Sequence, residues 1–145
     1  MTRREILKKL KVFFSTKELV CPHIYARFSE SSLDFLDTRL LETLLWIRTN
    51  IGKPIFINRG AATQRGMRCN MCEMVKSKKY AYLSSHILGM GIDFDVKDMD
   101  ADDVRAWLKT NKDNLPYNIR LEENVSWVHL DVRNETAEKI VYFKD

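Results

Sequence analysis

The chain has 145 residues, of which 45% are hydrophobic and 30% charged, and this composition excludes a disordered tail, a collagen-like repeat and a disulfide-dense mini-protein. A chain of this length buries enough apolar surface to fold as one domain without disulfides. The formal net charge of +4 favours anionic partners only weakly, because acidic residues are spread among the basic ones.

Cysteine content and hydropathy indicate where the chain is made. Three cysteines, an odd number, favour a reducing compartment over a secreted disulfide framework. The first residues are basic, but the apolar run that follows is only Val12–Phe14, so we expect no signal peptide. No run approaches the roughly 18 apolar residues of a membrane span. We therefore expect synthesis in the cytoplasm, with any action outside the cell requiring another route of release.

The residue pattern in the first third of the chain predicts mainly helices. Residues 1–14 form either an N-terminal arm or a short helix, and we assign residues 15–145 to one domain because no linker or repeat interrupts them. An apolar stripe predicts a helix from Asp37 or Thr38 to Asn50, capped by Asp37.

A buried strand at 55–57 and a long irregular segment follow that helix. Residues 59–83 are polar and show no periodicity. A loop of this length in a compact domain is usually functional or ordered by something it binds.

The residue pattern in the second half of the chain predicts mainly strands. Gly91–Val96 alternates as a strand, and Asp100 can cap a second helix whose Val104, Trp107 and Leu108 face inward. Three further strands are expected, the first two as a hairpin: Asn118–Leu121, Trp127–Val132 and Ile140–Phe143. This order predicts an α+β single domain, an antiparallel sheet with helices packed on one face.

Two of the three histidines stand in motifs that suit a metal. The first motif is Ser84-x-His86-x-x-Gly89-x-x-x-Asp93, and the second is Trp127-x-His129-x-Asp131. Glycines permit a sharp turn that brings His86 and Asp93 together, and His129 would come from a neighbouring strand. Three such ligands with one open position are typical of catalytic zinc. Judged by spacing alone, a histidine near a carboxylate more often forms a hydrogen-bonded pair than a metal site.

Together the two motifs resemble the M15 family of zinc D-Ala-D-Ala carboxypeptidases and peptidoglycan endopeptidases, most closely its phage or prophage (endolysin-type) branch. The similarity extends over about residues 15–135, including Leu40–Arg48 and Gly52-Lys53-Pro54-Ile55. It implies a Hedgehog/DD-peptidase-like fold and one zinc held by His86, Asp93 and His129. It also implies a bacterial cell-wall peptide as substrate, reached by phage or prophage release or as a virion component. Gly91 replaces the family's usual alanine, an exchange we expect to be harmless.

The general base is less clear, because many family members carry an acidic residue at the position of Ser126. A hydroxyl cannot serve as that base. Glu122 and Glu123 are the candidates. A glutamate of the Hedgehog domains, six residues before the last histidine, matches Glu123. An even hairpin loop would instead put Glu122 on the face of His129, and both remain open, as does a solvated charged turn.

Other polar residues are expected around this centre. Asp131 shares a strand face with His129 and would orient a ligand or an arginine, and Ser84 is a second supporting residue. The family uses an arginine from the long loop, although Asn58-Arg59-Gly60 stands in place of its Ser-Gly-Tyr-Arg. The candidates for binding a substrate carboxylate or an oxyanion are Arg59, Arg120 and, preferred, Arg65 and Arg68.

Cys69-x-x-Cys72 matches half of a zinc knuckle, and Cys21-Pro22-His23 offers a second half. Buried free thiols are the more common outcome. A redox Cys-x-x-Cys is disfavoured because no βαβ context surrounds it. The sequence therefore leaves a structural zinc at Cys21, His23, Cys69 and Cys72 as an open alternative.

Three functions follow from these patterns. The favoured one is a monomeric zinc peptidase acting on peptidoglycan stem peptides. The second is a catalytically inactive zinc-containing binding module of the same fold, which Ser126 supports. The third, nucleic-acid binding, rests only on a pI near 9.0 and the cysteines, and is disfavoured.

Overall fold

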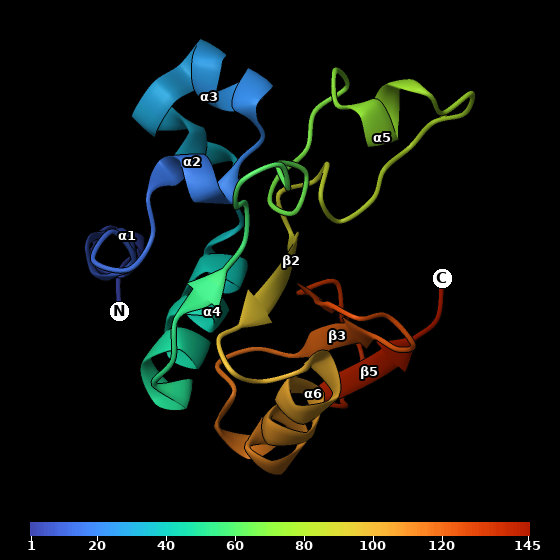
Figure 1. The fold of residues 1–145 in the computed structure, drawn as a ribbon. Coiled ribbons are helices and arrows are strands. Elements are labelled where there is room, and N and C mark those ends of the chain that lie inside the picture. The colour runs from blue at the N-terminus through green and yellow to red at the C-terminus, as the bar shows by residue number, and fades with distance from the viewer.

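A five-stranded sheet forms the centre of the computed structural model, which describes residues 1–145 (Figure 1). The strand order is β1-β2-β4-β3-β5. The strands are β1 (Ile55–Phe56), β2 (Gly91–Val96), β3 (Ile119–Glu122), β4 (Val128–Asp131) and β5 (Ile140–Phe143). The helices are α1 (Arg3–Leu10), α2 (Thr16–Leu19), α3 (Pro22–Phe28), α4 (Thr38–Ile51), α5 (Glu73–Lys76) and α6 (Ala101–Thr110), with 3-10 turns η1 (Ser29–Phe35) and η2 (Lys112–Asn114). The predicted α+β class is confirmed.

The sheet is mixed, so the prediction of an antiparallel sheet is wrong at one strand pair. The β3–β4 hairpin is antiparallel as expected, but β5 runs parallel to β3. The cause is the connection after β4, which ends beside the start of β3 and crosses that end of the strand. Asn134 holds this crossing by donating to the carbonyls of Ile119 and Glu138, both at 2.9 Å. β5 must therefore begin next to the start of β3 and run in the same direction.

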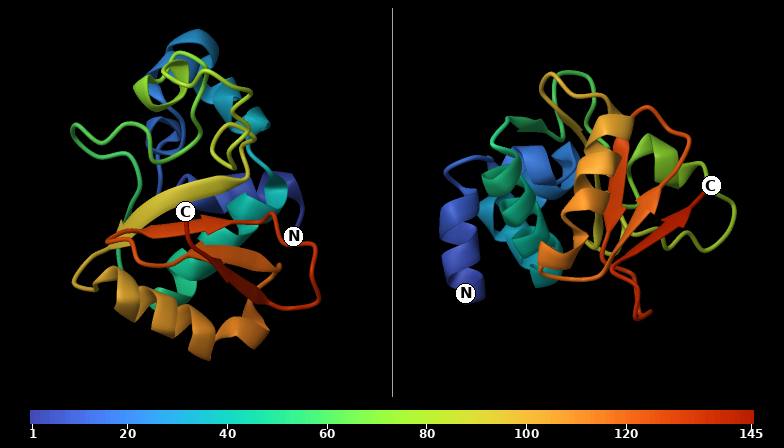
Figure 2. Two further views of the ribbon diagram at one scale, coloured as in Figure 1. Left: turned by 90° about the vertical axis from the view of Figure 1, so that its right-hand side faces the viewer. Right: turned by 90° about the horizontal axis from the view of Figure 1, so that it is seen from below.

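The two faces of the sheet differ in chemistry because side chains alternate along each strand. One face is apolar and contributes to the core through Ile92, Phe94, Val96, Ile119, Leu121, Val128 and Leu130. Helix α6 packs on this face, and α4 lies beyond it on the same side (Figure 2). Trp46 of α4 meets Trp107 of α6 with ring centroids 5.6 Å apart. The opposite face carries charged and imidazole side chains and faces the long loop.

Helix α4 matches its prediction closely. Asp37 caps it by accepting from the backbone N–H of Arg39 at 2.8 Å, and Gly52 ends it in the left-handed region at φ 68°. Helix α1 packs against α4, and the Arg3 guanidinium donates to the carbonyls of Leu33 and Leu36. None of the helices has the length and apolar character that crossing a membrane requires.

The long loop between β1 and β2 contains only the short helix α5. It lies beyond one end of the sheet, where α2 and α3 also gather (Figure 1). The backbone ties it to the N-terminal region through Met67, whose N–H donates to Leu19 and whose carbonyl accepts from Cys21 at 2.8 Å. The loop is therefore tethered at this end of the sheet, where its Arg68, Lys78 and Tyr82 line a cleft together with side chains of the polar face.

Candidate metal centre

Three side chains from the polar side of the sheet converge on one point. Asp93 of β2 and His129 of β4 are direct cross-strand partners, and His86 comes from the turn before β2. Asp93 Oδ1 lies 2.8 Å from His129 Nδ1 and 3.3 Å from His86 Nε2. One ligand atom from each residue lies within 4.8 Å of the others, and all three residues are buried. We call this group the histidine–aspartate centre.

The turn that carries His86 depends on Gly89. Its φ of +68° lies in the left-handed region, and a Cβ there would come within 2.2 Å of the carbonyl oxygen of Phe35. Only glycine fits this conformation and this close approach. The Gly89 carbonyl in turn accepts from the backbone N–H of Asp37 at 2.9 Å, which anchors the turn to the start of α4.

Both histidine rings are held through the nitrogen that faces away from Asp93. His86 Nδ1 lies 2.8 Å from the Gly66 carbonyl, and His129 Nε2 lies 2.9 Å from Asp131 Oδ2. Metal-binding histidines usually have their second nitrogen held by a carbonyl or carboxylate in this way. Ligands of a tetrahedral zinc lie about 3.3 Å apart, given bonds of about 2.0–2.1 Å. The donor set and its supports therefore suit a metal ion; the 3.3 Å between Asp93 and His86 matches this spacing, and the 2.8 Å between Asp93 and His129 is that of a direct hydrogen bond.

The charges of the centre favour ionised carboxylates. Burial alone would raise the pKa of Asp93. Hydrogen bonds from His129 and His86 outweigh burial and hold this pKa well below its ordinary value. Burial also opposes ionisation of Asp131, but His129 and Arg120 lower its pKa to about 2. Burial disfavours the charged imidazole, yet Asp131 and Asp93 raise the pKa of His129 to about 9. The centre therefore attracts positive charge, whether a proton or a metal cation.

The centre opens into a cleft of about 320 Å³. Side chains of the sheet and of the long loop both line it, namely Arg68, Met74, Lys78, Tyr82, Ser84, Arg120, Glu122, Trp127, Arg133, Phe143 and Asp145. Most of the lining side chains are charged or polar, so the cleft suits a polar or charged ligand.

The register of the sheet distinguishes the two candidate glutamates. Leu121 pairs with Leu130 across the hairpin, so continuing the register sets Glu122 beside His129 and on its face. Glu122 is also paired with Phe143 of β5 and lines the cleft, whereas Glu123 does not. Burial raises the pKa of Glu122. The hairpin loop therefore has the even length, and of the two glutamates Glu122 is the one that faces the histidine–aspartate centre.

The candidate arginines have different positions. Arg68 is buried in the cleft wall, with Nη2 3.5 Å from Asp93 Oδ2 and Nε donating to the Gln64 carbonyl at 2.6 Å. Arg65 does not line this cleft but an adjoining pocket, together with Arg68 and Asp93, and it pairs with Asp95 at 2.9 Å. Arg120 reaches the cleft but forms a bidentate pair with Asp131, with both contacts at 2.8 Å.

The remaining predicted residues also have definite places. Asp131 contacts both His129 and an arginine, the two roles considered for it. Ser84 lines the cleft with a buried Oγ that has no hydrogen-bond partner. Ser126 is exposed and does not line the cleft. Arg59 stacks on the ring of Phe56, 4.1 Å from its centroid.

Gly91 is packed closely against Ser85 in the turn before β2. A Cβ at this position would lie 2.3 Å from Ser85 Oγ and 3.1 Å from the Asp131 Cβ. Alanine therefore does not fit here without a shift of Ser85, which gives a packing reason for the glycine at this position. Ser85 Oγ itself lies 3.4 Å from His129 Nε2, so such a shift would reach the centre.

Sequence reasoning missed two basic residues of the cleft, Arg133 and Lys78. Arg133 continues the alternation of His129 and Asp131 beyond the end of β4, a signal that was available in the sequence. Lys78 carries no such signal, because only the path of the long loop brings it to the cleft.

A second group of candidate ligands, Cys21, His23, Cys69 and Cys72, lies together outside the sheet, and we call it the cysteine cluster. Its three thiols are free. Burial raises the pKa of Cys21 to about 12 and also raises that of Cys72, so a nearby cation is needed to hold these sulfurs as thiolates.

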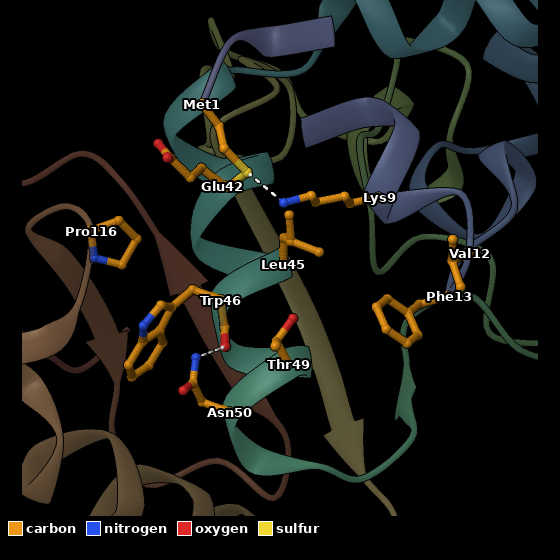
Figure 3. A pocket seen from close by; sticks show the side chains of 10 residues that line it. All are labelled: Met1, Lys9, Val12, Phe13, Glu42, Leu45, Trp46, Thr49, Asn50 and Pro116. Carbon is orange, nitrogen blue, oxygen red and sulfur yellow. Dashed lines mark hydrogen bonds between the residues drawn. The ribbon is translucent and has the colours of Figure 1, made fainter. Parts of the chain in front are cut away.

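A separate cavity of about 460 Å³ lies between α1 and α4 (Figure 3). Phe13, Leu45 and Trp46 give it a largely apolar lining, and it contains no predicted site residue. The chemistry of the molecule is therefore concentrated in the histidine–aspartate centre and the cysteine cluster.

No family model, curated protein or solved structure matches this chain. The structure itself supports two residue groups that could bind a metal ion.

Proposed function

We propose that this chain is a zinc-dependent peptidase that hydrolyses an amide bond in bacterial peptidoglycan stem peptides. The observation that carries the proposal is the histidine–aspartate centre, in which both histidines are held through their second nitrogen beside a cleft. The resemblance of its motifs to the M15 family supplies the substrate class. A zinc ion bound by His86, Asp93 and His129 would polarise the scissile carbonyl and lower the pKa of water.

Glu122 is the general base of this proposal. Its carboxylate belongs to the row of side chains that runs from Asp93 through His129 to β5, so it faces the reacting groups. It would accept a proton from the attacking water and return it to the leaving amine. Burial raises the pKa of Glu122, which brings the carboxyl closer to the range in which it can both accept and donate.

Arg68 and Arg133 bind the substrate in this proposal. Both line the cleft, and their guanidinium groups suit a carboxylate of a stem peptide or the oxygen that becomes negative during attack. Arg120 is committed to Asp131 and acts as a positioning residue. The unpartnered Ser84 Oγ offers a further hydrogen bond to the substrate.

The test compares two neighbouring glutamates. Glu122→Gln keeps the shape of the side chain and removes the base, so we expect hydrolysis of peptidoglycan fragments to fall by about 10²–10⁴-fold. Glu123→Gln is the matched control, because this residue does not line the cleft, and we expect its activity to stay near wild type. Equal loss in both variants would contradict the assignment of Glu122.

Ser126 favours a second candidate, an inactive zinc-containing binding module, because no acidic residue stands at the position where many family members carry one. Native mass spectrometry combined with the activity assay separates the two. A peptidase binds zinc, loses that zinc in His86→Ala and turns over substrate. A binding module binds zinc at the same residues, and no fragment is cleaved.

A further inference from the structure

The cysteine cluster joins two segments that are far apart in the sequence. Cys21 and His23 stand at the start of α3, while Cys69 and Cys72 belong to the long loop. The Sγ atoms of Cys21 and Cys69 are 3.6 Å apart, and Cys72 Sγ lies 3.8 Å from His23 Nδ1. One donor atom from each of the four residues lies within 4.8 Å of the others.

These separations match a shared metal ion better than a disulfide. A disulfide would bring two sulfurs to about 2.05 Å. Sulfur ligands of a tetrahedral zinc, each bonded at about 2.3 Å, lie about 3.8 Å from one another. The 3.6 Å separation of Cys21 and Cys69 is close to that value. Three thiols and one imidazole are also a common ligand set of structural zinc.

Backbone N–H groups point at all three sulfurs. The amide of Ile24 lies 3.5 Å from Cys21 Sγ, that of Met71 lies 3.4 Å from Cys69 Sγ, and that of Cys69 lies 3.5 Å from Cys72 Sγ. Hydrogen bonds to a ligand atom fix its position and stabilise its negative charge. These amides would therefore stabilise negative charge on the sulfurs once a bound cation offsets the effect of burial.

We propose that Cys21, His23, Cys69 and Cys72 bind a second metal ion, a structural zinc with four protein ligands and no open position. The histidine–aspartate centre shares no residue with this site, so the proposal does not depend on the peptidase function. With all four positions filled by protein, the ion holds two chain segments together and has no place for a substrate.

The site would fix the part of the long loop that reaches the cleft. Arg68 directly precedes Cys69, and its N–H donates to the His86 carbonyl at 3.1 Å. On the other side, the Cys21 N–H donates to the Met67 carbonyl. A zinc ion at the cysteine cluster would thus fix Cys69, which follows Arg68, and Cys21, which bonds to Met67, and so hold the arginine beside Asp93.

The experiment counts zinc per chain by native mass spectrometry in four forms of the 145-residue chain. We expect two zinc ions in the wild type and one in the His86→Ala/His129→Ala variant. We also expect one in His23→Ala, whose exposed side chain can be removed without damage to the core. His23→Cys supplies a thiolate at the same point and is expected to restore the second ion.

Cobalt identifies which site remains occupied. With Co²⁺ in place of zinc, the His86→Ala/His129→Ala variant should keep intense thiolate-to-cobalt charge-transfer absorption, because its only site contains sulfur. Cys72→Ser should lose that absorption while it retains metal at the histidine–aspartate centre. Met71→Ala, an exposed change between two of the ligands, is the matched control and should behave as the wild type.

Two results would overturn the proposal. One is a His86→Ala/His129→Ala protein that is folded by circular dichroism and binds no metal. The other is a Cys21–Cys69 disulfide that persists in protein freshly purified under reducing conditions. It would be detected as a mass 2 Da lower and as one alkylated cysteine instead of three. Loss of metal from the cysteine cluster alone would leave the peptidase proposal standing, and the reverse also holds.

Discussion

The histidine–aspartate centre rests on paired strands, whereas the cysteine cluster joins a helix start to a loop. In the first, Asp93 and His129 are cross-strand partners, so ladder hydrogen bonds fix their separation before any ligand arrives. In the second, α5 has only four residues, and few backbone bonds connect the loop to α3. The comparison teaches that the sheet preforms one site, while the other would take part of its order from a bound ion.

The largest expected effect is that of removing metal with a chelator. We expect hydrogen exchange in the long loop around Cys69 and Cys72 to accelerate by about 100-fold or more, because the ion contributes to local stability there. Amides of β2 and β4 should change by less than about threefold, since ladder bonds protect them. Equal acceleration in strands and loop would show that the sheet is not preformed. The His86→Ala/His129→Ala variant serves as control, since only the cysteine cluster remains in it.

The second prediction concerns the turn that carries His86. Gly89→Ala should lower the free energy of unfolding by about 3 kcal/mol, because the energetic cost of the positive φ and that of the clash with the Phe35 carbonyl add together. Gly60→Ala is the matched control, with a φ of +59° but open space around the new Cβ. We expect it to cost about 1 kcal/mol. Urea unfolding of both variants measures the difference, and similar costs would mean that the turn tolerates a side chain.

A smaller effect is expected at the support of His129. Asp131→Asn keeps an oxygen acceptor but removes the charge, so zinc affinity of the histidine–aspartate centre should fall by about 10–100-fold. Affinity at the cysteine cluster should not change. Asp95→Asn, on the same face of β2 but exposed, is the control. Competition with a chromophoric chelator measures both affinities, and an equal loss at the two sites would contradict the local role of Asp131.

The smallest effect concerns the scaffold behind both sites. Asp37→Ala removes the cap of α4 and should cost about 1 kcal/mol. Hydrogen bonds from Arg39 lower the pKa of Asp37, so its contribution is present above the unfolded-state pKa of about 3.9 and is lost as pH falls through the folded-state value. Asp37→Asn retains the cap without the charge, and its stability should vary less with acid. Thermal unfolding between about pH 3 and 7 follows both variants.

The sequence predicted those parts of the fold whose cause is local. The apolar stripe and cap of α4, the alternation of β2 and the cap of α6 each depend on neighbours within one element, and all three elements are present. The direction of β5 depends instead on the crossing held by Asn134, which no apolar pattern encodes. That is why the parallel pair was missed.

The residues of the candidate sites also divide into those that local sequence predicts and those that depend on the tertiary structure. The spacing of His86, Asp93 and His129 could be interpreted because it follows from a turn and a strand pair. The choice between Glu122 and Glu123 required the parity of a hairpin loop, which only the strand register gives. The arginines could not be ranked beforehand, because the path of an irregular loop decides which of them faces the cleft.

The close contact between Gly91 and Ser85 has an evolutionary consequence. The order in which substitutions occur at these two positions matters, because an alanine at 91 meets both the Oγ of Ser85 at 2.3 Å and its Cβ at 2.8 Å. A lineage that acquires alanine at 91 first places its Cβ against both Ser85 atoms, whereas one that first exchanges Ser85 for glycine removes both atoms beforehand. The two positions should therefore vary together among descendants of this chain, and a double-mutant library should recover the pair far more often than Gly91→Ala alone.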